Sequence, residues 1–426
     1  MNKNNLSAVV NDLDRIIIFR NLKNDSVLKN LKKILKNEDF SQLSDLIYTL
    51  VDTSIREGVK GDIWHNYLKN IIISSENIFT LKAERGEINF NSSLYRLVRD
   101  DFKIISQLFS FSFKDLLSAS TYQDLDYLAN FNLDDLEFDS NRFKIYQKLF
   151  TANSAEKNLE ELLEFYYQYG ASILNQSRAF YWQNDSLSLV NNPDPISFDD
   201  LVFYQKAQKK LIENTESFLA GFKAHNALLY GDSGTGKSSS VKALVNKFYR
   251  QGLRLIEINS SQIKELPAIL EYLNNRGLFF IIFMDDLSFE EFETDYKYLK
   301  AVMEGGIESK PDNVLFYATS NRRHLVREKW QDRESEIHEN DILNEKLSLS
   351  ERFGLTLMFN SPSQAEYLKI VRKLAARAGL KLNENKLEKR ALQWSKWNNG
   401  RSGRSARQFI DQLFKENHYK NKNINQ

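Results

Sequence analysis

One stretch of the chain, 231–238, limits the possible folds more than any other. It reads GDSGTGKS and matches the pattern G-x-x-x-x-G-K-[ST] at every fixed position. A strand-like HNALLY segment precedes it and a helix-like SSSVKALVNKFY segment follows, which is the context that the pattern requires. Glycines let the backbone curl so that successive N–H groups point toward phosphate oxygens, and the helix adds its N-terminal dipole. The sequence therefore predicts a phosphate-binding loop between a strand and a helix.

The side chains of this loop indicate which ligand it binds. We expect Lys237 to place its ammonium against the β- and γ-phosphates of a nucleotide, and Ser238 to offer its hydroxyl to Mg²⁺. ATP and Mg²⁺ are therefore the expected cofactors. The predicted nucleotide-binding residues of the loop are Gly231, Asp232, Ser233, Gly234, Thr235, Gly236, Lys237, Ser238 and Ser239.

The middle of the chain alternates between strand and helix patterns. Apolar runs at 226–230, 253–258, 278–284 and 314–318 predict strands, and residues 238–249 predict a helix. Strands that alternate with helices imply a parallel sheet with both faces covered. The sequence thus predicts an α/β nucleotide-binding core.

Both ends of the chain have helical patterns. Residues 1–190 place apolar residues at spacings of three and four, and their frequent Phe and Tyr are expected to fill a helical core. The stretch NNPDPISF, which starts at residue 191, has two prolines and polar turn formers and is typical of a linker. Helical patterns return near residue 363. We predict a helical N-terminal domain at 1–190, the core at 191–361 and a helical lid with a polar tail at 362–426.

Composition excludes several classes of site. The chain has no cysteine, which excludes disulfides and thiolate chemistry, and its five histidines lack the spacing of a helical metal site. The formal net charge of +1 gives no global tendency to bind nucleic acid. The N-terminus lacks a secretory pattern, and the apolar run at 278–284 is too short to span a bilayer. We expect a soluble, cytoplasmic protein with no membrane association.

Two carboxylates follow the apolar run at 278–284. Asp285 and Asp286 come at the carboxyl edge of the predicted parallel sheet, where ligands bind. Asp285 is expected to coordinate Mg²⁺, mostly through water, and Asp286 to orient or activate the attacking water. Many P-loop ATPases have Glu at the second position, and Asp is shorter by one methylene. We interpret Glu290 and Glu291 as solvated helix residues.

The motifs that follow resemble those of the AAA+ ATPases, and in the same order. VLFYATSN, which ends at Asn321, resembles the sensor 1 strand, which implies that Asn321 helps to position the hydrolytic water. LSERFG, at 349–354, resembles the arginine-finger motif and is similar to the corresponding stretch of the bacterial replication initiator DnaA. Arg352 would then reach the γ-phosphate of a neighbouring subunit, since a guanidinium is always charged and binds two oxygens at once.

Two further segments extend this resemblance. GRSGRSAR, at 400–407, resembles sensor 2, where Arg404 fits best and Arg407, one turn later, is the alternative. ISFDDLVFYQKAQKKLIENTESFL resembles the segment that cradles adenine in this superfamily. The implied adenine contacts are Leu201, Val202 and Tyr204. The residues with implied catalytic roles are Lys237, Asp286, Asn321, Arg352 and Arg404.

The resemblance covers about residues 195–415 and looks most like an uncharacterised bacterial AAA+ family, the domain-of-unknown-function family 815. It implies a five-stranded parallel P-loop core with a small C-terminal helical lid, preceded by an all-α N-terminal domain. It also implies an ATPase that drives conformational change or remodelling of a macromolecular partner. A finger that acts in trans implies a homo-oligomer with head-to-tail interfaces.

Two other functions stay open from the sequence. Asp286 in place of Glu is compatible with a slowly hydrolysing, nucleotide-dependent binding switch. The likeness of the finger region to DnaA is compatible with a DNA-associated protein, although the near-neutral charge argues against it. We interpret the basic cluster of Arg322, Arg323 and Arg327 as a solvated face. The client, a protein or a nucleic acid, is not identified by the sequence.

Overall fold

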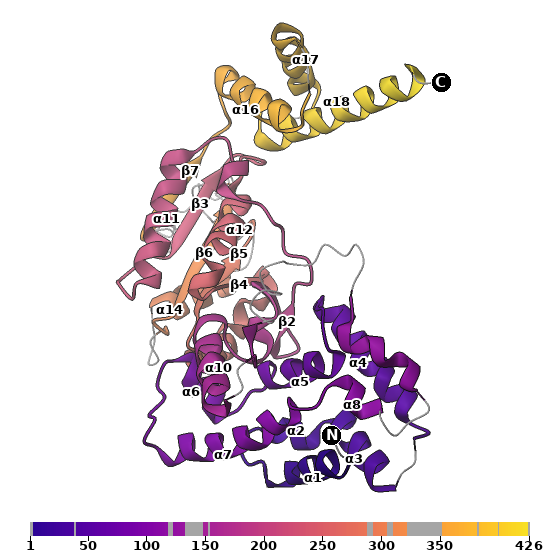
Figure 1. Ribbon diagram of the computed structural model, residues 1–426. Helices are drawn as coiled ribbons and strands as arrows, with labels where there is room; N and C mark the ends of the chain where they lie inside the picture. Colours follow the sequence, from indigo (N-terminus) through magenta and orange to yellow (C-terminus); the bar gives the residue numbers. More distant parts are fainter. Residues whose placement is uncertain are drawn as a thin grey trace. The chain divides into compact units, whose positions relative to one another are not determined.

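The chain folds into two compact units, described here from a computed structural model (Figure 1). Unit 1 comprises Met1–Gln176 with Arg276–Leu278, and unit 2 comprises Ser177–Asn275 with Phe279–Gln426. The structure describes residues 3–37, 40–117, 122–132, 148–151, 154–287, 293–304, 310–321, 352–380, 383–398 and 400–424.

The described part of unit 1 is helical, as its apolar spacing predicts. Aromatic side chains fill its centre: the ring of Phe19 meets those of Phe79 and Phe102 edge to face, and all three are fully buried. Its helices are α1 (Lys3–Asp12), α2 (Arg20–Asn24), α3 (Ser26–Asn37), α4 (Leu43–Glu57), α5 (Ile63–Ile73), α6 (Ile78–Glu84), α7 (Ser93–Leu108), α8 (Phe113–Leu117) and α10 (Ala155–Tyr169), with short 3-10 turns at Leu13–Arg15, Gln123–Asn130 and Ser172–Asn175.

Unit 2 contains one seven-stranded sheet in the order β2-β1-β4-β5-β6-β3-β7. All neighbouring strands are parallel except β1 and β2. The five parallel strands from β4 to β7 in this order confirm the predicted α/β core, and β6 is buried along its whole length. The strands are β1 (Ala179–Gln183), β2 (Ser186–Leu189), β3 (Ala227–Gly231), β4 (Leu253–Ile258), β5 (Phe279–Met284), β6 (Val314–Ser320) and β7 (Leu355–Phe359).

The β1–β2 hairpin corrects the sequence prediction. We expected helices up to residue 190 and five strands, but AFYWQ and SLSL pair as a hairpin, and β1 then adds to β4 in parallel. Asn184 and Asp185 form its turn with φ values of 51° and 55°, the left-handed conformation that these residues tolerate. Over so few residues, apolar periodicity cannot distinguish a strand from a helix. The helical unit therefore ends at Gln176 rather than at residue 190.

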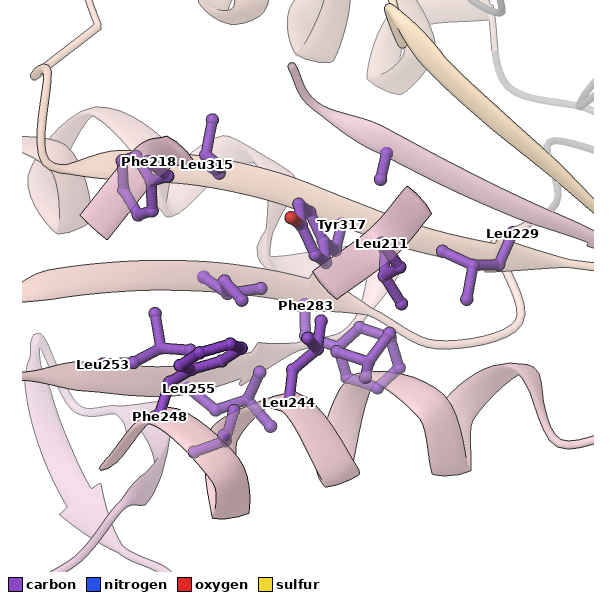
Figure 2. Packing of buried hydrophobic residues seen from close by; sticks show 14 of the residues in the cluster. Leu211, Phe218, Leu229, Leu244, Phe248, Leu253, Leu255, Phe283, Leu315 and Tyr317 are labelled. Atoms are coloured by element: carbon purple, nitrogen blue, oxygen red, sulfur yellow. The ribbon is translucent and has the colours of Figure 1, made fainter. Parts of the chain in front are cut away.

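Helices of unit 2 cover the sheet and seal its core. In Figure 2, Leu244 and Phe248 of the helix after the phosphate loop pack against Leu253 and Leu255 of β4. Tyr317 of β6 lies in the same cluster, and its hydroxyl lies 2.9 Å from the hydroxyl of Thr215. The helices are α11 (Gln205–Leu219), α12 (Lys237–Phe248), α13 (Leu266–Asn274) and α14 (Glu293–Glu304), with 3-10 turns at Phe198–Asp200, Tyr249–Gln251 and Ser260–Glu265.

The last three helices of unit 2 form the predicted lid. They are α16 (Gln364–Arg377), α17 (Glu384–Trp397) and α18 (Gly403–Ile424), and they share an apolar cluster of their own. Val202 and Phe203 pack against this cluster, so the segment before α11 joins the lid to the core. Within the described residues, the structure has no helix whose length and apolar character would let it cross a membrane.

Candidate nucleotide-binding site

A cavity of about 600 Å³ opens in unit 2 beside the phosphate loop. Three parts of the fold form its walls: the loop itself, the carboxyl ends of β5 and β6, and the lid with the segment before α11. The predicted site residues that line it are Ser233, Gly234, Thr235, Gly236, Lys237, Ser238, Ser239, Asp285, Asp286, Asn321, Leu201, Val202, Tyr204, Arg404 and Arg407. Gly231, Asp232 and Arg352 do not line it.

Gly231 and Asp232 shape the loop. Gly231 has φ 134°, and a Cβ there would lie 2.2 Å from the carbonyl oxygen of Phe359 at the end of β7, so only glycine fits. The Asp232 carboxylate accepts a hydrogen bond of 2.7 Å from the Ser361 N–H, and hydrogen bonds from Ser361 lower the pKa of that carboxyl. These two residues fix the start of the loop against β7.

Lys237 is held at the mouth of the loop. The residue is 7% exposed, and its Nζ donates to the carbonyls of Gly231 and Asp232 at 2.7 and 2.8 Å. It also donates to Asn321 Oδ1 at 3.0 Å. Burial lowers the pKa of the ammonium, while the carboxylates of Asp286, Asp232 and Asp285 favour its charged form. A positive charge thus lies where the pattern places the nucleotide phosphates.

Ser238 and Asp285 bring together two oxygens of the kind that hold Mg²⁺ in nucleotide sites. The Ser238 hydroxyl donates to Asp285 Oδ1 at 2.6 Å, so the first turn of α12 and the end of β5 meet. Mg²⁺ in nucleotide sites is commonly held by one or two protein oxygens together with phosphates and water. These donors fit that pattern. Among the described residues, no group of three His, Cys, Asp or Glu could hold a metal ion without such help.

Asp286 has a strained backbone and firm side-chain contacts. Its φ is 53°, in the left-handed region that Asp tolerates better than most residues. Its N–H donates to Thr319 Oγ1 at 2.8 Å, and Asn321 Nδ2 donates to its Oδ1 at 2.7 Å. Asn321 therefore links Lys237 to Asp286, and the carboxylate faces the cavity in a defined direction.

Thr319 is a site residue that sequence reasoning missed. It lies at the end of β6, is 1% exposed, and its hydroxyl donates to Asp285 Oδ1 at 2.5 Å. The same hydroxyl accepts the Asp286 N–H. One buried side chain thus positions both acids. A polar residue in an otherwise apolar strand, directly before the predicted sensor, is the signal that could have identified it.

The structure separates the two candidate sensor 2 arginines. The Arg404 N–H donates to the Gly234 carbonyl at 3.2 Å, and its positive charge is among the groups that bear on the pKa of Lys237. Hydrogen bonds from Ser197 lower the pKa of Asp200, and the charge of Arg407 contributes to the same effect. Arg404 therefore lies toward the phosphate end of the cavity and Arg407 toward Asp200, which favours Arg404 as the sensor.

Arg352 lies just before β7 and is exposed. It does not line the cavity of its own chain, which is compatible with a role in a neighbouring subunit. Its motif begins at Leu349, and residues 349–351 lie outside the described residues, as do Glu290, Glu291, Arg322, Arg323 and Arg327. The roles assigned to these residues stay predictions.

The end of the cavity opposite the acids is largely apolar. Tyr204 has φ 74°, its hydroxyl donates to the Asn360 carbonyl, and its ring centroid lies 4.7 Å from that of Phe359. These contacts hold the segment before α11 in place. Beside the predicted contacts, the lining residues of the cavity include Phe203, Gln208, Ile370 and Leu374, which the sequence did not single out. The flat face of a nucleotide base fits against apolar side chains of this kind.

Comparison with known families decides which group the chain belongs to. Residues 175–417 match the family described as "Protein of unknown function (DUF815)", and the match covers more than half of the chain. The chain belongs to the DUF815 family. This confirms the resemblance to the domain-of-unknown-function family 815 that was drawn from the sequence. The DUF815 match spans unit 2 up to α18 and leaves nearly all of unit 1 outside.

Parts of well-known proteins are also similar to this DUF815 chain. Replication factor C subunit 3 of Schizosaccharomyces pombe is 30% identical over 92 residues, which are 21% of this chain and 26% of that protein. The replication factor C large subunit of Staphylothermus marinus is 38% identical over 76 residues, 18% of this chain and 17% of that protein. The chain thus spans about a quarter or less of the length of these curated relatives.

Solved structures of RuvB from Thermotoga maritima are similar over half of the chain. A RuvB variant aligns with a TM-score of 0.38 and 17% identity, covering 51% of this chain and 64% of that one. The structure described as the RuvB Holliday junction branch migration motor aligns with a TM-score of 0.36 and 17% identity, covering 51% and 63%.

Proposed function

We propose that this protein binds ATP with Mg²⁺ and hydrolyses it to drive a conformational change in a macromolecular partner. The observation that carries the proposal is the meeting of Ser238 and Asp285, 2.6 Å apart, beside the buried ammonium of Lys237 in one cavity. The phosphate loop, the Mg²⁺-binding pair and the second acid, Asp286, then lie around the position of the γ-phosphate, which is the arrangement that phosphoryl transfer to water requires.

The residues around this point divide the work of hydrolysis. Lys237 and the loop N–H groups bind the β- and γ-phosphates, and Ser238 and Asp285 hold Mg²⁺, which when bound neutralises phosphate charge. The Asp286 carboxylate accepts the proton of the attacking water, and Asn321, bonded to Asp286, orients that water. Arg404 approaches the γ-phosphate from the lid, where its fixed charge stabilises the transition state.

Completion of the site requires a second subunit in this proposal. Arg352 is exposed and does not line its own cavity, so its guanidinium would act on the γ-phosphate held by a neighbour. A head-to-tail contact of this kind repeats and generates a ring or an open helical assembly.

Turnover per subunit is expected to rise with protein concentration. Arg352→Ala should lower the rate at saturating concentration by about 1,000-fold, the lower range for an arginine finger. Phosphate release measured across a dilution series tests this. Mixing Arg352→Ala subunits with Lys237→Ala subunits should restore part of the activity, because an interface at which the Lys237→Ala subunit supplies the finger and the Arg352→Ala subunit supplies the pocket is intact. A monomer that is fully active and indifferent to Arg352→Ala would refute the trans finger.

A nucleotide-dependent binding switch is the second candidate function. Asp286 is a short acid whose Oδ1 already accepts a hydrogen bond from Asn321, which is compatible with slow hydrolysis. Negligible turnover in every oligomeric state would favour the switch, and fast turnover stimulated by a client would count against it. Whether the client is a nucleic acid is decided by salt-dependent filter binding to single- and double-stranded DNA.

Thr319→Val is expected to lower ATP turnover at least about tenfold and to raise the Mg²⁺ concentration needed for half-maximal rate. The substitution keeps the shape but removes the donor to Asp285 and leaves the Asp286 N–H without its acceptor, which costs roughly 1–3 kcal/mol. Phosphate release titrated with Mg²⁺ measures both effects. Thr319→Ser keeps the hydroxyl and should restore the Mg²⁺ dependence; equal behaviour of the two variants would mean that Thr319 only fills space.

A further inference from the structure

Gln208 is a polar side chain in the apolar end of the cavity. It lies on α11 one turn after Tyr204, is 5% exposed, and lines the cavity beside Val202. A buried amide in an apolar slot needs partners for its donors and its acceptor. What this amide offers to a ligand therefore follows from the contacts that it already makes.

The contacts of Gln208 orient its amide. Nε2 donates to the carbonyl oxygen of Phe203 at 2.8 Å. The reversed amide would set two acceptor oxygens against each other, so this carbonyl fixes which end is the NH₂ group. None of the described residues donates a hydrogen bond to Oε1. This oxygen is nevertheless not one of the side-chain atoms that are fully buried without a partner, so part of its surface is accessible. Gln208 is 5% exposed and lines the cavity, so we infer that the accessible surface of Oε1 faces the cavity and that this oxygen can accept a hydrogen bond from a ligand there.

The surroundings of that oxygen fit a purine ring. Leu201 and Val202 of the segment before α11 and Ile370 and Leu374 of the lid helix α16 all line the cavity, and their apolar side chains suit the flat face of a base. The phosphates are fixed at the other end of the cavity by the loop. The edge of the base then meets the acceptor Gln208 Oε1. A donor group on the base makes this contact a hydrogen bond, and an acceptor group makes it repulsive.

We propose that Gln208 selects adenine over guanine nucleotides at this site; the inference rests on the proposed function and adds its base specificity. Adenine carries an amino group at C6, which donates to an amide oxygen, whereas guanine carries an oxygen there, which accepts. An adenine N6–H thus satisfies Gln208 Oε1. A guanine O6 in the same place faces a second acceptor and leaves both oxygens desolvated and unpaired.

Binding of diphosphates to the full-length protein tests the inference, because ADP and GDP share every phosphate contact. By isothermal titration calorimetry in Mg²⁺, we expect the wild type to bind ADP about 10- to 100-fold more tightly than GDP. Gln208→Met, which keeps the side-chain length, should bring the two affinities within about threefold of each other. Lys210→Met is the control, since Lys210 is exposed on the same helix and does not line the cavity; it should leave the ratio unchanged.

Inosine diphosphate gives a test that needs no variant. It differs from ADP in the ring chiefly by an oxygen at C6, so the wild type should bind it as weakly as GDP. Equal affinity for ADP and inosine diphosphate would overturn the inference even if Gln208→Met fails to fold. An adenine preference that survives Gln208→Met would also overturn it while ATP binding stands. Failure of the wild type to bind any of the three nucleotides would instead overturn the proposed function.

Discussion

Lys237→Ala should weaken the binding of Mg-ATP by at least about 100-fold, or about 2.8 kcal/mol. The Lys237 ammonium is a buried positive charge at the loop, and a methyl group replaces none of the contacts that we expect it to make with phosphate oxygens. The substitution also removes the hydrogen bonds from Lys237 to the carbonyls of Gly231 and Asp232, of which the second keeps its bond from Thr235, so the loop loses part of its own support. Isothermal titration calorimetry with a slowly hydrolysed ATP analogue measures the change.

Lys247→Ala is the matched control for this experiment. Lys247 is an exposed lysine near the other end of α12, and we expect its loss to leave ATP affinity unchanged. Thermal unfolding of both variants shows whether the loop change has reached the core. Unchanged ATP affinity in folded Lys237→Ala would contradict the assignment of the loop as the phosphate site, and with it the proposed ATPase.

Asp286→Asn should lower the single-turnover rate of ATP hydrolysis by about 10²- to 10⁴-fold while ATP affinity stays within about threefold. The amide has the shape of the carboxylate, can still accept the hydrogen bond from Asn321, and tolerates the φ of 53° at this position. What it cannot do is accept the proton of the attacking water. Rapid-quench measurement with enzyme in excess isolates this step from product release.

Asp285→Asn separates the two acids. This substitution weakens the metal pair with Ser238, so we expect its defect to be eased by higher Mg²⁺, whereas that of Asp286→Asn is not. An Asp286→Asn protein held in the ATP state also serves as bait in a pull-down for the client. Full hydrolysis by Asp286→Asn would show that another group activates the water.

The phosphate loop and the acids after β5 were predictable because local sequence determines them. Glycines at fixed positions, a lysine and a strand that ends in carboxylates suffice to predict the loop and the position of both acids; their roles stay predictions. Arg404 and Arg407 lie one turn apart on α18, so spacing alone could not choose between them. The backbone bond from Arg404 to Gly234 favours one of them, and only the folded lid contains it.

Thr319 and Gln208 were not predictable because partners distant in the sequence define their roles. Thr319 is 34 positions from Asp285, with which it shares a hydrogen bond, and the register of β5 with β6 brings them together. Gln208 looks in the sequence like any polar residue of an amphipathic helix, and only the fold shows that it is buried and lines the cavity. The β1–β2 hairpin escaped for a related reason, since its strands are short and are stabilised by the edge of β4.

The short strand β7 has a mechanical consequence. It pairs with β3 along its whole length, receives the Asp232 N–H at the Phe359 carbonyl, and touches Gly231 so closely that no side chain fits. Arg352 precedes this strand by three residues and the lid helix α16 follows it by five. These short connections couple the positions of Arg352 and α16 closely to that of β7. If ATP binds as proposed, a shift of the loop would move β7 as one unit, and with it Arg352 at one end and the lid at the other.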